Sequence, residues 1–276
     1  MNKTAIFLGS KPGGVVALER LIERGWEVKA VILPKNIDLS WIKMPSLEAV
    51  CIRNLIPIYK DQSDIFDIEV DFVISYLSRN LVKKPLRHLA KIASVNFHPG
   101  PLPKYAGYAF YNLAILEESE FYGCTCHHMD DGFDTGDLIK VRSFPIDSNN
   151  ETAYSLERKT QLEMLRLFDD FLDIAECSAA IPSKPQDPEA HRYLSRLQFD
   201  KLKVIKPGAE YAEVQKIARA FWYPPYLGAH YIDSKEGKVQ IVPDIVMRNL
   251  GELLHVKDFE ILQNTFHGDC SVLQSD

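Results

Sequence analysis

The sequence predicts an α/β protein with a doubly wound, mostly parallel sheet of Rossmann-like topology and a smaller C-terminal α+β subdomain. Three observations indicate this class. Short apolar runs alternate with apolar stripes at helical spacing over residues 4–175, which is typical of strands joined by helical crossovers. The first apolar run ends in a Gly-rich turn that leads into a helical stripe. A Pro-rich segment then follows the longest predicted helix and opens a part of different texture.

Each element of the first part has its own signal. Short apolar runs predict strands at residues 4–8, 27–33, 72–77, 93–96 and 122–129. Apolar residues three and four apart predict helices at residues 15–22, 46–54 and 110–116, and Ser46 is a typical N-cap for the second of these. A long amphipathic helix over residues 152–175 closes the series, with an apolar face made of Leu156, Leu162, Leu165, Phe168, Phe171 and Leu172.

The segment 181–188 marks a domain boundary, because its three prolines prevent regular structure. We therefore predict one domain over residues 1–180 and a C-terminal subdomain over residues 181–276. The subdomain has one clear helical pattern at residues 211–221, followed by the aromatic and Pro-rich segment 221–226. β-like segments are expected at residues 238–242 and 253–262.

Composition excludes several classes of function. The 276 residues include 32 Lys and Arg against 38 Asp and Glu, a formal net charge of −6, and the part from residue 181 onward supplies no basic surface. An acidic chain repels nucleic acid and anionic membranes, so no nucleic-acid or membrane partner is expected. No apolar stretch approaches a membrane span, the first run is too short for a signal peptide, and the odd number of cysteines fits reduced thiols, so a cytoplasmic protein is expected.

The first candidate site is the turn Gly9-Ser10-Lys11-Pro12-Gly13-Gly14. Glycines let the backbone approach a ligand, and a helix N-terminus favours anions. The spacing matches neither the G-x-G-x-x-G pattern nor a Walker motif. A turn that only connects strand and helix is the alternative.

The second candidate site lies at the end of the strand near residue 96. Asn96 and His98 share a face at strand spacing, and a Pro/Gly loop follows them. Ligands of open α/β sheets bind beyond the carboxyl ends of the strands, which is where this pair is expected. A histidine that only makes structural hydrogen bonds is the alternative.

An acidic turn supplies the third candidate. Residues 129–137 hold four carboxylates and two glycines, but not at the spacing of a calcium-binding EF-hand loop. A carboxylate near a histidine would instead orient the ring and stabilise its cation. The neighbouring run Cys124-Thr125-Cys126-His127-His128 lacks a distant second ligand pair, so we interpret it as packing residues and expect no metal site.

Taken together, these motifs resemble the N10-formyltetrahydrofolate-dependent formyltransferases. The resemblance covers about residues 1–180 and is carried by Asn96-x-His98-Pro99, Leu102-Pro103-Lys104-Tyr105-x-Gly107, Thr125-x-His127 and Gly132-Phe133-Asp134-Thr135-Gly136-Asp137. It implies a formyltransferase domain over residues 1–180 and a catalytic set of Asn96, His98 and Asp134. It also implies N10-formyltetrahydrofolate as the formyl donor, with no metal. The implied donor contacts are Asn80, Leu81, Met129, Asp130 and Asp131.

The resemblance leaves the acceptor to be chosen. Methionyl-tRNA formyltransferases commonly read Arg-Gly-Ala-Ala-Pro where this chain reads Ala106-Gly107-Tyr108-Ala109-Phe110, and their substrate demands basic surface. The segment Arg219–Ala229 resembles nucleotide-sugar N-formyltransferases instead, so a small-molecule nucleotide sugar is expected. Expected substrate contacts are Ser10, Lys11, Gly13, Arg79, Tyr108, Trp222 and Tyr223.

The most specific expectation is dTDP-4-amino-4,6-dideoxyglucose as the acceptor, in O-antigen or other surface (lipo)polysaccharide biosynthesis. The alternatives are a methionyl-tRNA formyltransferase and an inert folate- or nucleotide-binding module. A homodimer formed through the C-terminal part is expected. The aromatic residues of 221–226 could stack on the base of the nucleotide, and the alternative is that they are interface or core residues.

Overall fold

A computed structural model describes residues 2–9, 11–33, 46–65, 67–78, 81–107, 110–178, 180–190, 193–194 and 196–254. The strands are β1 (Thr4–Gly9), β2 (Glu27–Ile32), β3 (Ile58–Tyr59), β4 (Val70–Tyr76), β5 (Ala90–His98), β6 (Ala106–Gly107), β7 (Phe121–His128), β8 (Leu138–Pro145), β9 (Tyr193–Leu194), β10 (His230–Asp233) and β11 (Gly237–Gln240). The α-helices are α1 (Lys11–Glu23), α2 (Leu47–Arg53), α3 (Lys84–Arg87), α4 (Phe110–Leu116), α5 (Ala153–Cys177), α6 (Arg196–Leu202), α7 (Tyr211–Phe221) and α8 (Asp244–Leu254). Short 3₁₀ turns lie at Gln62–Asp64 and Pro188–Ala190.

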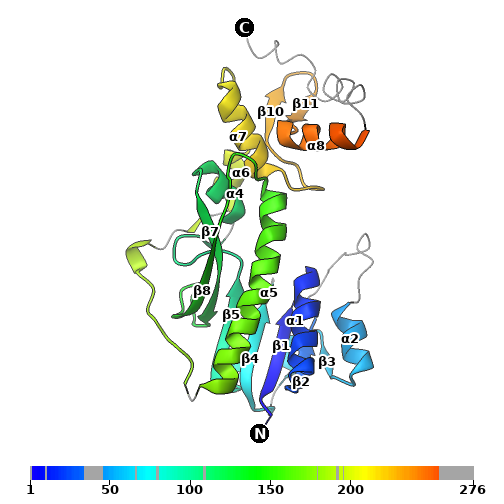
Figure 1. Cartoon of the computed structure of the whole chain (residues 1–276), viewed down its shortest axis with the longest axis vertical. Coiled ribbons are helices and arrows are strands. Elements are labelled where there is room, and N and C mark those ends of the chain that lie inside the picture. Colours follow the sequence, from blue (N-terminus) through cyan, green and yellow to red (C-terminus); the bar gives the residue numbers. More distant parts are fainter. Residues whose placement is uncertain are drawn as a thin grey trace. The chain divides into compact units, whose positions relative to one another are not determined.

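The central sheet has seven strands in the order β3-β2-β1-β4-β5-β7-β8 (Figure 1). The pairs β2/β3, β1/β2, β1/β4 and β4/β5 are parallel, whereas β5 and β7 pair antiparallel. The predicted mostly parallel α/β sheet is therefore confirmed. The change of direction at β7 matters for the site, because the carboxyl end of β5 meets residues 125–128 of β7.

The two faces of the sheet bury different residues of the same strands. Ala5 and Phe7 of β1 belong to one apolar cluster with residues of α1, α2 and α5, whereas Ile6 and Leu8 belong to another with Val82 and Leu86. Side chains alternate across a strand, so a run without polar residues is needed where both faces are covered. This is why the first apolar run predicts a buried strand.

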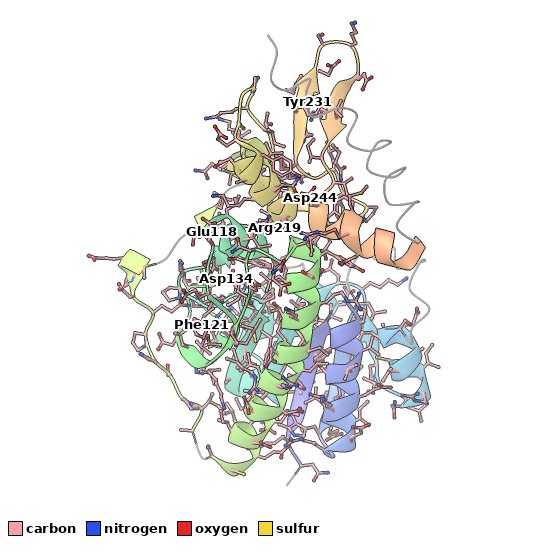
Figure 2. All side chains as sticks on the ribbon, turned by 45° about the horizontal axis from the view of Figure 1, so that its top comes forward. Glu118, Phe121, Asp134, Arg219, Tyr231 and Asp244 are labelled. Carbon is pink, nitrogen blue, oxygen red and sulfur yellow. The ribbon has the colours of Figure 1, made fainter. Side chains whose placement is uncertain are left out.

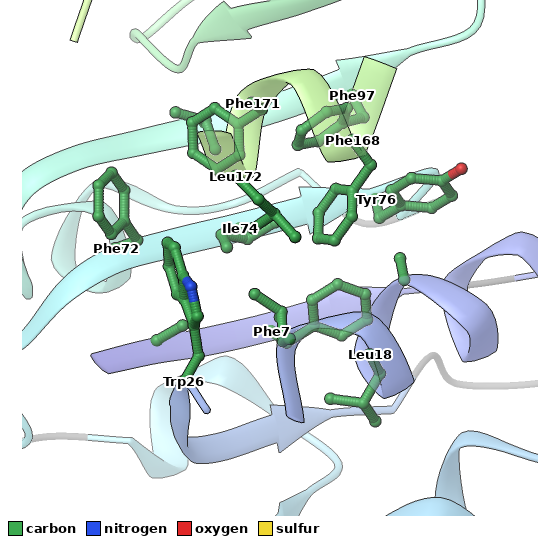
Figure 3. Packing of buried hydrophobic residues seen from close by; sticks show 14 of the residues in the cluster. Phe7, Leu18, Trp26, Phe72, Ile74, Tyr76, Phe97, Phe168, Phe171 and Leu172 are labelled. Atoms are coloured by element: carbon green, nitrogen blue, oxygen red, sulfur yellow. The ribbon is translucent and has the colours of Figure 1, made fainter. Parts of the chain in front are cut away.

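Aromatic rings join α5 to the sheet (Figure 3). The ring of Phe168 lies 5.6 Å from that of Tyr76 in β4 and 5.0 Å from that of Phe97 in β5. Phe72 and Phe171 make an edge-to-face pair at 5.7 Å. The predicted apolar face of the helix is confirmed at Phe168, Phe171 and Leu172, but the prediction for Leu162 is wrong, because this side chain is 62% exposed.

Helix α1 begins earlier than the sequence pattern indicates. Gly13 and Gly14 lie in its first turn rather than in the connecting loop. A Cβ on Gly13 would approach Oε1 of Gln161 to 2.7 Å, so the glycine allows close packing of α1 against α5. Helix α2 starts as predicted, since the Ser46 side chain accepts a hydrogen bond from the Ala49 N–H.

The chain divides into two compact units. The first comprises residues 1–106, 123–143 and 160–192, and the second comprises residues 107–122, 144–159 and 193–276. The C-terminal part thus forms one unit with α4 and the first turns of α5. The functional domain limits at residues 180 and 181 stay a prediction.

The second unit combines helices with a small hairpin. Helix α7 occupies the predicted residues, and β10 pairs antiparallel with β11 close to the predicted segment 238–242. The prediction of β structure at 253–262 is wrong for residues 253–254, which end α8, and the remainder lies outside the described residues. Among the residues that the structure describes, no helix combines the length and apolar character needed to span a membrane.

Replacing Phe168 by Ala is expected to destabilise the protein by about 3–5 kcal/mol, because the substitution leaves a cavity among the fully buried rings of α5, β4 and β5. Leu162→Ala on the exposed side of the same helix is the matched control, with an expected change within about 0.5 kcal/mol. Denaturant unfolding of both variants measures the difference. Equal losses of stability would contradict this account of the core.

Candidate active site

A row of polar side chains crosses three neighbouring strands. The register places Ser75 of β4 beside Asn96 of β5, and Asn96 beside His127 of β7. The Ser75 hydroxyl donates to Oδ1 of Asn96 at 2.8 Å, and Nδ2 of Asn96 lies 3.0 Å from Nε2 of His127. The two partners hold the Asn96 amide by its oxygen and by its nitrogen, so its orientation is set by the sheet.

The proton on His127 follows from its other contact. Nδ1 of His127 lies 2.7 Å from the carbonyl oxygen of His128, and a carbonyl oxygen only accepts. Nδ1 therefore carries the proton, and Nε2 accepts from one N–H of Asn96. An amide nitrogen carries two hydrogens, so a second N–H of Asn96 can be offered to a ligand.

His98 is buried at the carboxyl end of β5, and its protonation is the reverse of that of His127. Its Nε2 lies 2.7 Å from the carbonyl oxygen of Tyr105, so Nε2 donates. In the neutral ring, Nδ1 is then the atom able to accept a proton. In each of the two histidines, one ring nitrogen donates to a main-chain carbonyl and the other nitrogen keeps its lone pair. The nitrogen with the lone pair is Nδ1 in His98 and Nε2 in His127.

Asp134, which is labelled in Figure 2, lies on the loop after β7 and close to both histidines. Its Oδ2 is 3.5 Å from Nδ1 of His98 and its Oδ1 is 3.7 Å from Nε2 of His127. Its side chain is 17% exposed. The carboxylate is placed to stabilise positive charge on His98 when Nδ1 takes a proton.

Burial lowers the pKa of His98 from its ordinary value of 6.5, while Asp134 acts in the opposite direction. Removing the ring from water disfavours the cation more than the nearby carboxylate favours it. A neutral His98 near pH 7 suits a general base, because the lone pair is already present.

Thr125 fastens the Pro/Gly loop that follows His98. Its hydroxyl donates to the Gly100 carbonyl at 2.8 Å and accepts from the Leu102 N–H at 3.0 Å. Tyr105, whose carbonyl holds His98, is buried at the end of this loop. The motif residues from 98 to 105 therefore act together to fix one imidazole ring.

Hydrogen bonds and an ion pair hold the acidic turn, although Asp130 and Asp131 are exposed. Asp130 accepts from the Gly132 N–H and from the Thr135 hydroxyl. Asp131 pairs with the Arg87 guanidinium. A Cβ on Gly136 would lie 1.9 Å from the carbonyl oxygen of His128, so only glycine fits there.

The structure brings together some of the predicted site residues. Asn96, His98 and Asp134 form one cluster, and the loop that carries Asp130 and Asp131 continues into it. Met129 is half-buried and Leu81 is 49% exposed. The remaining predicted contacts Ser10, Arg79, Asn80 and Tyr108, with the side chain of Lys11, lie outside the described residues.

His127 and Ser75 contact Asn96 in the candidate site, but neither was predicted as a catalytic or binding residue. The interpretation of residues 124–128 as packing is confirmed for Cys124 and Cys126, which are fully buried in the core. It is wrong for His127, which faces the other side of β7 and contacts Asn96. The period of two along the strand separates the two groups and is the signal that could have found His127. No group of three or more metal-ligating side chains occurs among the described residues.

In the second unit, the predicted contact Tyr223 has a structural partner. Its hydroxyl bonds the buried carboxyl of Glu157, and burial raises the pKa of Glu157 to about 7. The Tyr223 ring lies 6.0 Å from those of Tyr154 and Tyr226, and Trp222 is half-buried. These contacts anchor the aromatic segment within its own unit.

Charged residues surround a pocket of about 370 Å³ in the second unit, which is lined by residues of α7 with Glu118 and Asn149. Burial lowers the pKa of Arg219, while Glu118, Asp147 and Asp244 act against this effect. Figure 2 labels Glu118, Arg219 and Asp244. The lining includes Lys216, which pairs with Glu118 at 3.6 Å. The mixture of charges singles out neither an anionic nor a cationic ligand.

Comparison with known proteins identifies the family. A model of the formyl transferase family matches residues 60–168. GDP-perosamine N-formyltransferase from Brucella melitensis is 32% identical over 180 residues, which are 65% of this chain and 66% of that protein. The fold, the site and these matches place the chain in the formyl transferase family.

Within the family, the chain is similar to sugar N-formyltransferases. The crystal structure of the N-formyltransferase from Helicobacter canadensis, in complex with folinic acid and dTDP-3-aminofucose, superposes with a TM-score of 0.71 at 25% identity, covering 88% of this chain and 87% of that one. Methionyl-tRNA formyltransferase from Clostridioides difficile is 23% identical over 271 residues, covering 91% of this chain and 84% of that protein.

The pKa of His98 is expected to lie below 6.5 and to fall further in Asp134→Asn, because that substitution removes the charge that favours the cation while burial remains. NMR titration of the imidazole measures both values. Asp131→Asn, which neutralises a carboxylate of the same loop that pairs with Arg87, is the control and should leave His98 unchanged. A rise in the pKa of His98 in Asp134→Asn would contradict the electrostatic account.

Proposed function

We propose that this protein transfers a formyl group from N10-formyltetrahydrofolate to the amino group of a nucleotide-linked amino sugar. The observation that carries the proposal is the pairing of two oppositely protonated histidines around Asn96 and Asp134. This arrangement offers a hydrogen-bond donor and a neutral base side by side. Acyl transfer to an amine needs both.

The reaction forms a bond between the amine nitrogen and the formyl carbon and breaks the bond from that carbon to the donor nitrogen. Negative charge develops on the formyl oxygen in the transition state, and the second N–H of Asn96 donates to it. Nδ1 of His98 accepts the proton that the amine loses. Asp134 stabilises the resulting imidazolium, and the proton passes on to the leaving nitrogen.

The donor supplies the activated formyl carbon. The residues proposed to hold it are Leu81, Met129, Asp130 and Asp131, together with Asn80. Exposed Leu81 and half-buried Met129 provide apolar surface beside a polar loop, which suits a flat ring with polar edges. The side chains of Asp130 and Asp131 are engaged by Thr135 and Arg87, so the loop would meet the donor chiefly through its main chain.

For the acceptor, we propose a dideoxy amino sugar on a nucleoside diphosphate, with dTDP-4-amino-4,6-dideoxyglucose as the first candidate. The complex from Helicobacter canadensis contains a dTDP-linked amino sugar, and the relative from Brucella is named for a GDP-linked one. The net charge of −6 disfavours tRNA. A role in surface polysaccharide synthesis, a dimer and a cytoplasmic location stay predictions.

The proposal is tested by a donor-dependent formylation assay over a panel of acceptors. The panel contains dTDP-, UDP- and GDP-linked sugars with the amine at C3 or C4, together with charged initiator tRNA. We expect formylation of a nucleotide sugar, with dTDP-4-amino-4,6-dideoxyglucose as the best substrate. Formylation of the tRNA while every nucleotide sugar is ignored would contradict the proposal and favour a methionyl-tRNA formyltransferase.

Asn96→Ala is the matched control for this assay. It should lower kcat by about 10²–10³-fold, because it removes a donor to the developing oxyanion. A folded variant that turns over like the wild type would show that the formyl oxygen lies elsewhere. No formylation of any acceptor by the wild-type protein would favour an inert binding module.

A further inference from the structure

The segment 182–186, which we name the strap, follows α5 and runs along the acidic loop. The N–H and carbonyl of Lys184 both bond the main chain of Leu138, at 3.0 and 2.7 Å. The Ser183 hydroxyl donates to Asp137 at 2.6 Å, and Nε2 of His128 donates to the Pro182 carbonyl at 2.9 Å. The strap therefore contacts both ends of the loop that carries Asp134.

Gln186 reaches from the strap into the loop itself. Its Nε2 donates to the carbonyl oxygen of Asp134 at 2.9 Å and to that of Gly136 at 2.7 Å. Both acceptors are carbonyls, so the nitrogen of the amide must face them. Oε1 of Gln186 is buried with no hydrogen-bond partner among the described residues. The side chain thus keeps its two donor bonds at the expense of an unpaired acceptor.

The loop needs such support at this point. Asp134 has a φ of 56°, a left-handed conformation that a residue other than glycine adopts at a cost. Gly136, two residues later, has no space for a side chain. The two bonds from Gln186 bracket the strained backbone and the residue after it.

We propose that Gln186 is a positioning residue that holds the carboxylate of Asp134 against Nδ1 of His98. This inference rests on the proposed function, in which Asp134 stabilises the His98 cation. Gln186 acts through the main chain of Asp134 and lies in the segment whose prolines predicted only a domain boundary. A residue after the predicted boundary at 180 thereby takes part in the chemistry of the first unit.

Loss of the two bonds lets the Asp134 backbone relax, and its carboxylate then moves away from His98. Misplacement of a catalytic group by about 1 Å can reduce a rate by about 10²-fold. Asp134 and His127 are the titratable groups that act on His98. Asp134 favours its charged form, as does the hydrogen bond to the Tyr105 carbonyl, whereas His127 opposes it. A more distant Asp134 makes His98 a weaker base, so the acid limb of the kcat profile moves to lower pH.

The experiment compares two variants with a control. Gln186→Met keeps the length of the side chain and removes both donors, whereas Gln186→Glu replaces them with a carboxylate facing two carbonyls. Glu189→Gln, on the exposed turn beyond the strap, is the control. Each is assayed for kcat and KM with the best acceptor from the panel, for the pH dependence of kcat, and for the pKa of His98 by NMR.

We expect kcat to fall about 10- to 100-fold in Gln186→Met and further in Gln186→Glu, with KM for the acceptor changed less than about threefold. The acid limb and the pKa of His98 should move to lower pH in both variants and stay unchanged in Glu189→Gln. A folded Gln186→Met protein with the wild-type pKa of His98 would overturn the proposal, as would a loss of kcat without any pH shift. The NMR measurement needs no substrate. It therefore tests the positioning role of Gln186 even if the proposed sugar acceptor is wrong.

Discussion

The antiparallel pairing of β5 with β7 is the constraint on which the site depends. The parallel strands β1, β4 and β5 end at one edge of the sheet. A further parallel strand next to β5 would need a long crossover connection before it could end at the same edge. β7 instead runs back along β5, so its residues from 125 to 128 meet those from 95 to 98. This register puts Thr125 opposite His98 and His127 opposite Asn96, and it delivers the acidic loop directly after His128.

The electrostatics of the site follow from main-chain carbonyls that this register positions. The carbonyl of His128 holds the proton of His127 on Nδ1, and the carbonyl of Tyr105 holds that of His98 on Nε2. Carbonyl oxygens cannot donate, so each ring is limited to one neutral tautomer. Burial favours the neutral form of His98, and the Asp134 carboxylate lies where it can stabilise the positive charge on His98 in the proposed reaction. The fold thus prepares a base through burial of His98, the carbonyl of Tyr105 and the carboxylate of Asp134.

Much of this arrangement could be predicted from local patterns. The strands of the first part, the Ser46 cap and the helices α4 and α7 have strong periodicity, and Asn96 and His98 were recognisable by strand spacing and the loop after them. Other features depend on contacts distant in sequence. β8 alternates half-buried residues, among them Lys140 and Arg142, with exposed ones such as Val141 and lacks an apolar run, so no strand was predicted there. Gln186 lies in a Pro-rich segment, and only its two carbonyl partners, about 50 residues away, show its role.

The central claim is that two carbonyls impose opposite tautomers on the two histidines and leave Nδ1 of His98 as the proton acceptor. ¹⁵N NMR of the imidazole nitrogens above neutral pH tests it most directly, with His98→Gln and His127→Gln variants to assign the signals. The account predicts a protonated Nε2 and an unprotonated Nδ1 in His98, and the reverse in His127. A proton on Nδ1 of His98 in the neutral ring, or the same tautomer in both rings, would contradict it.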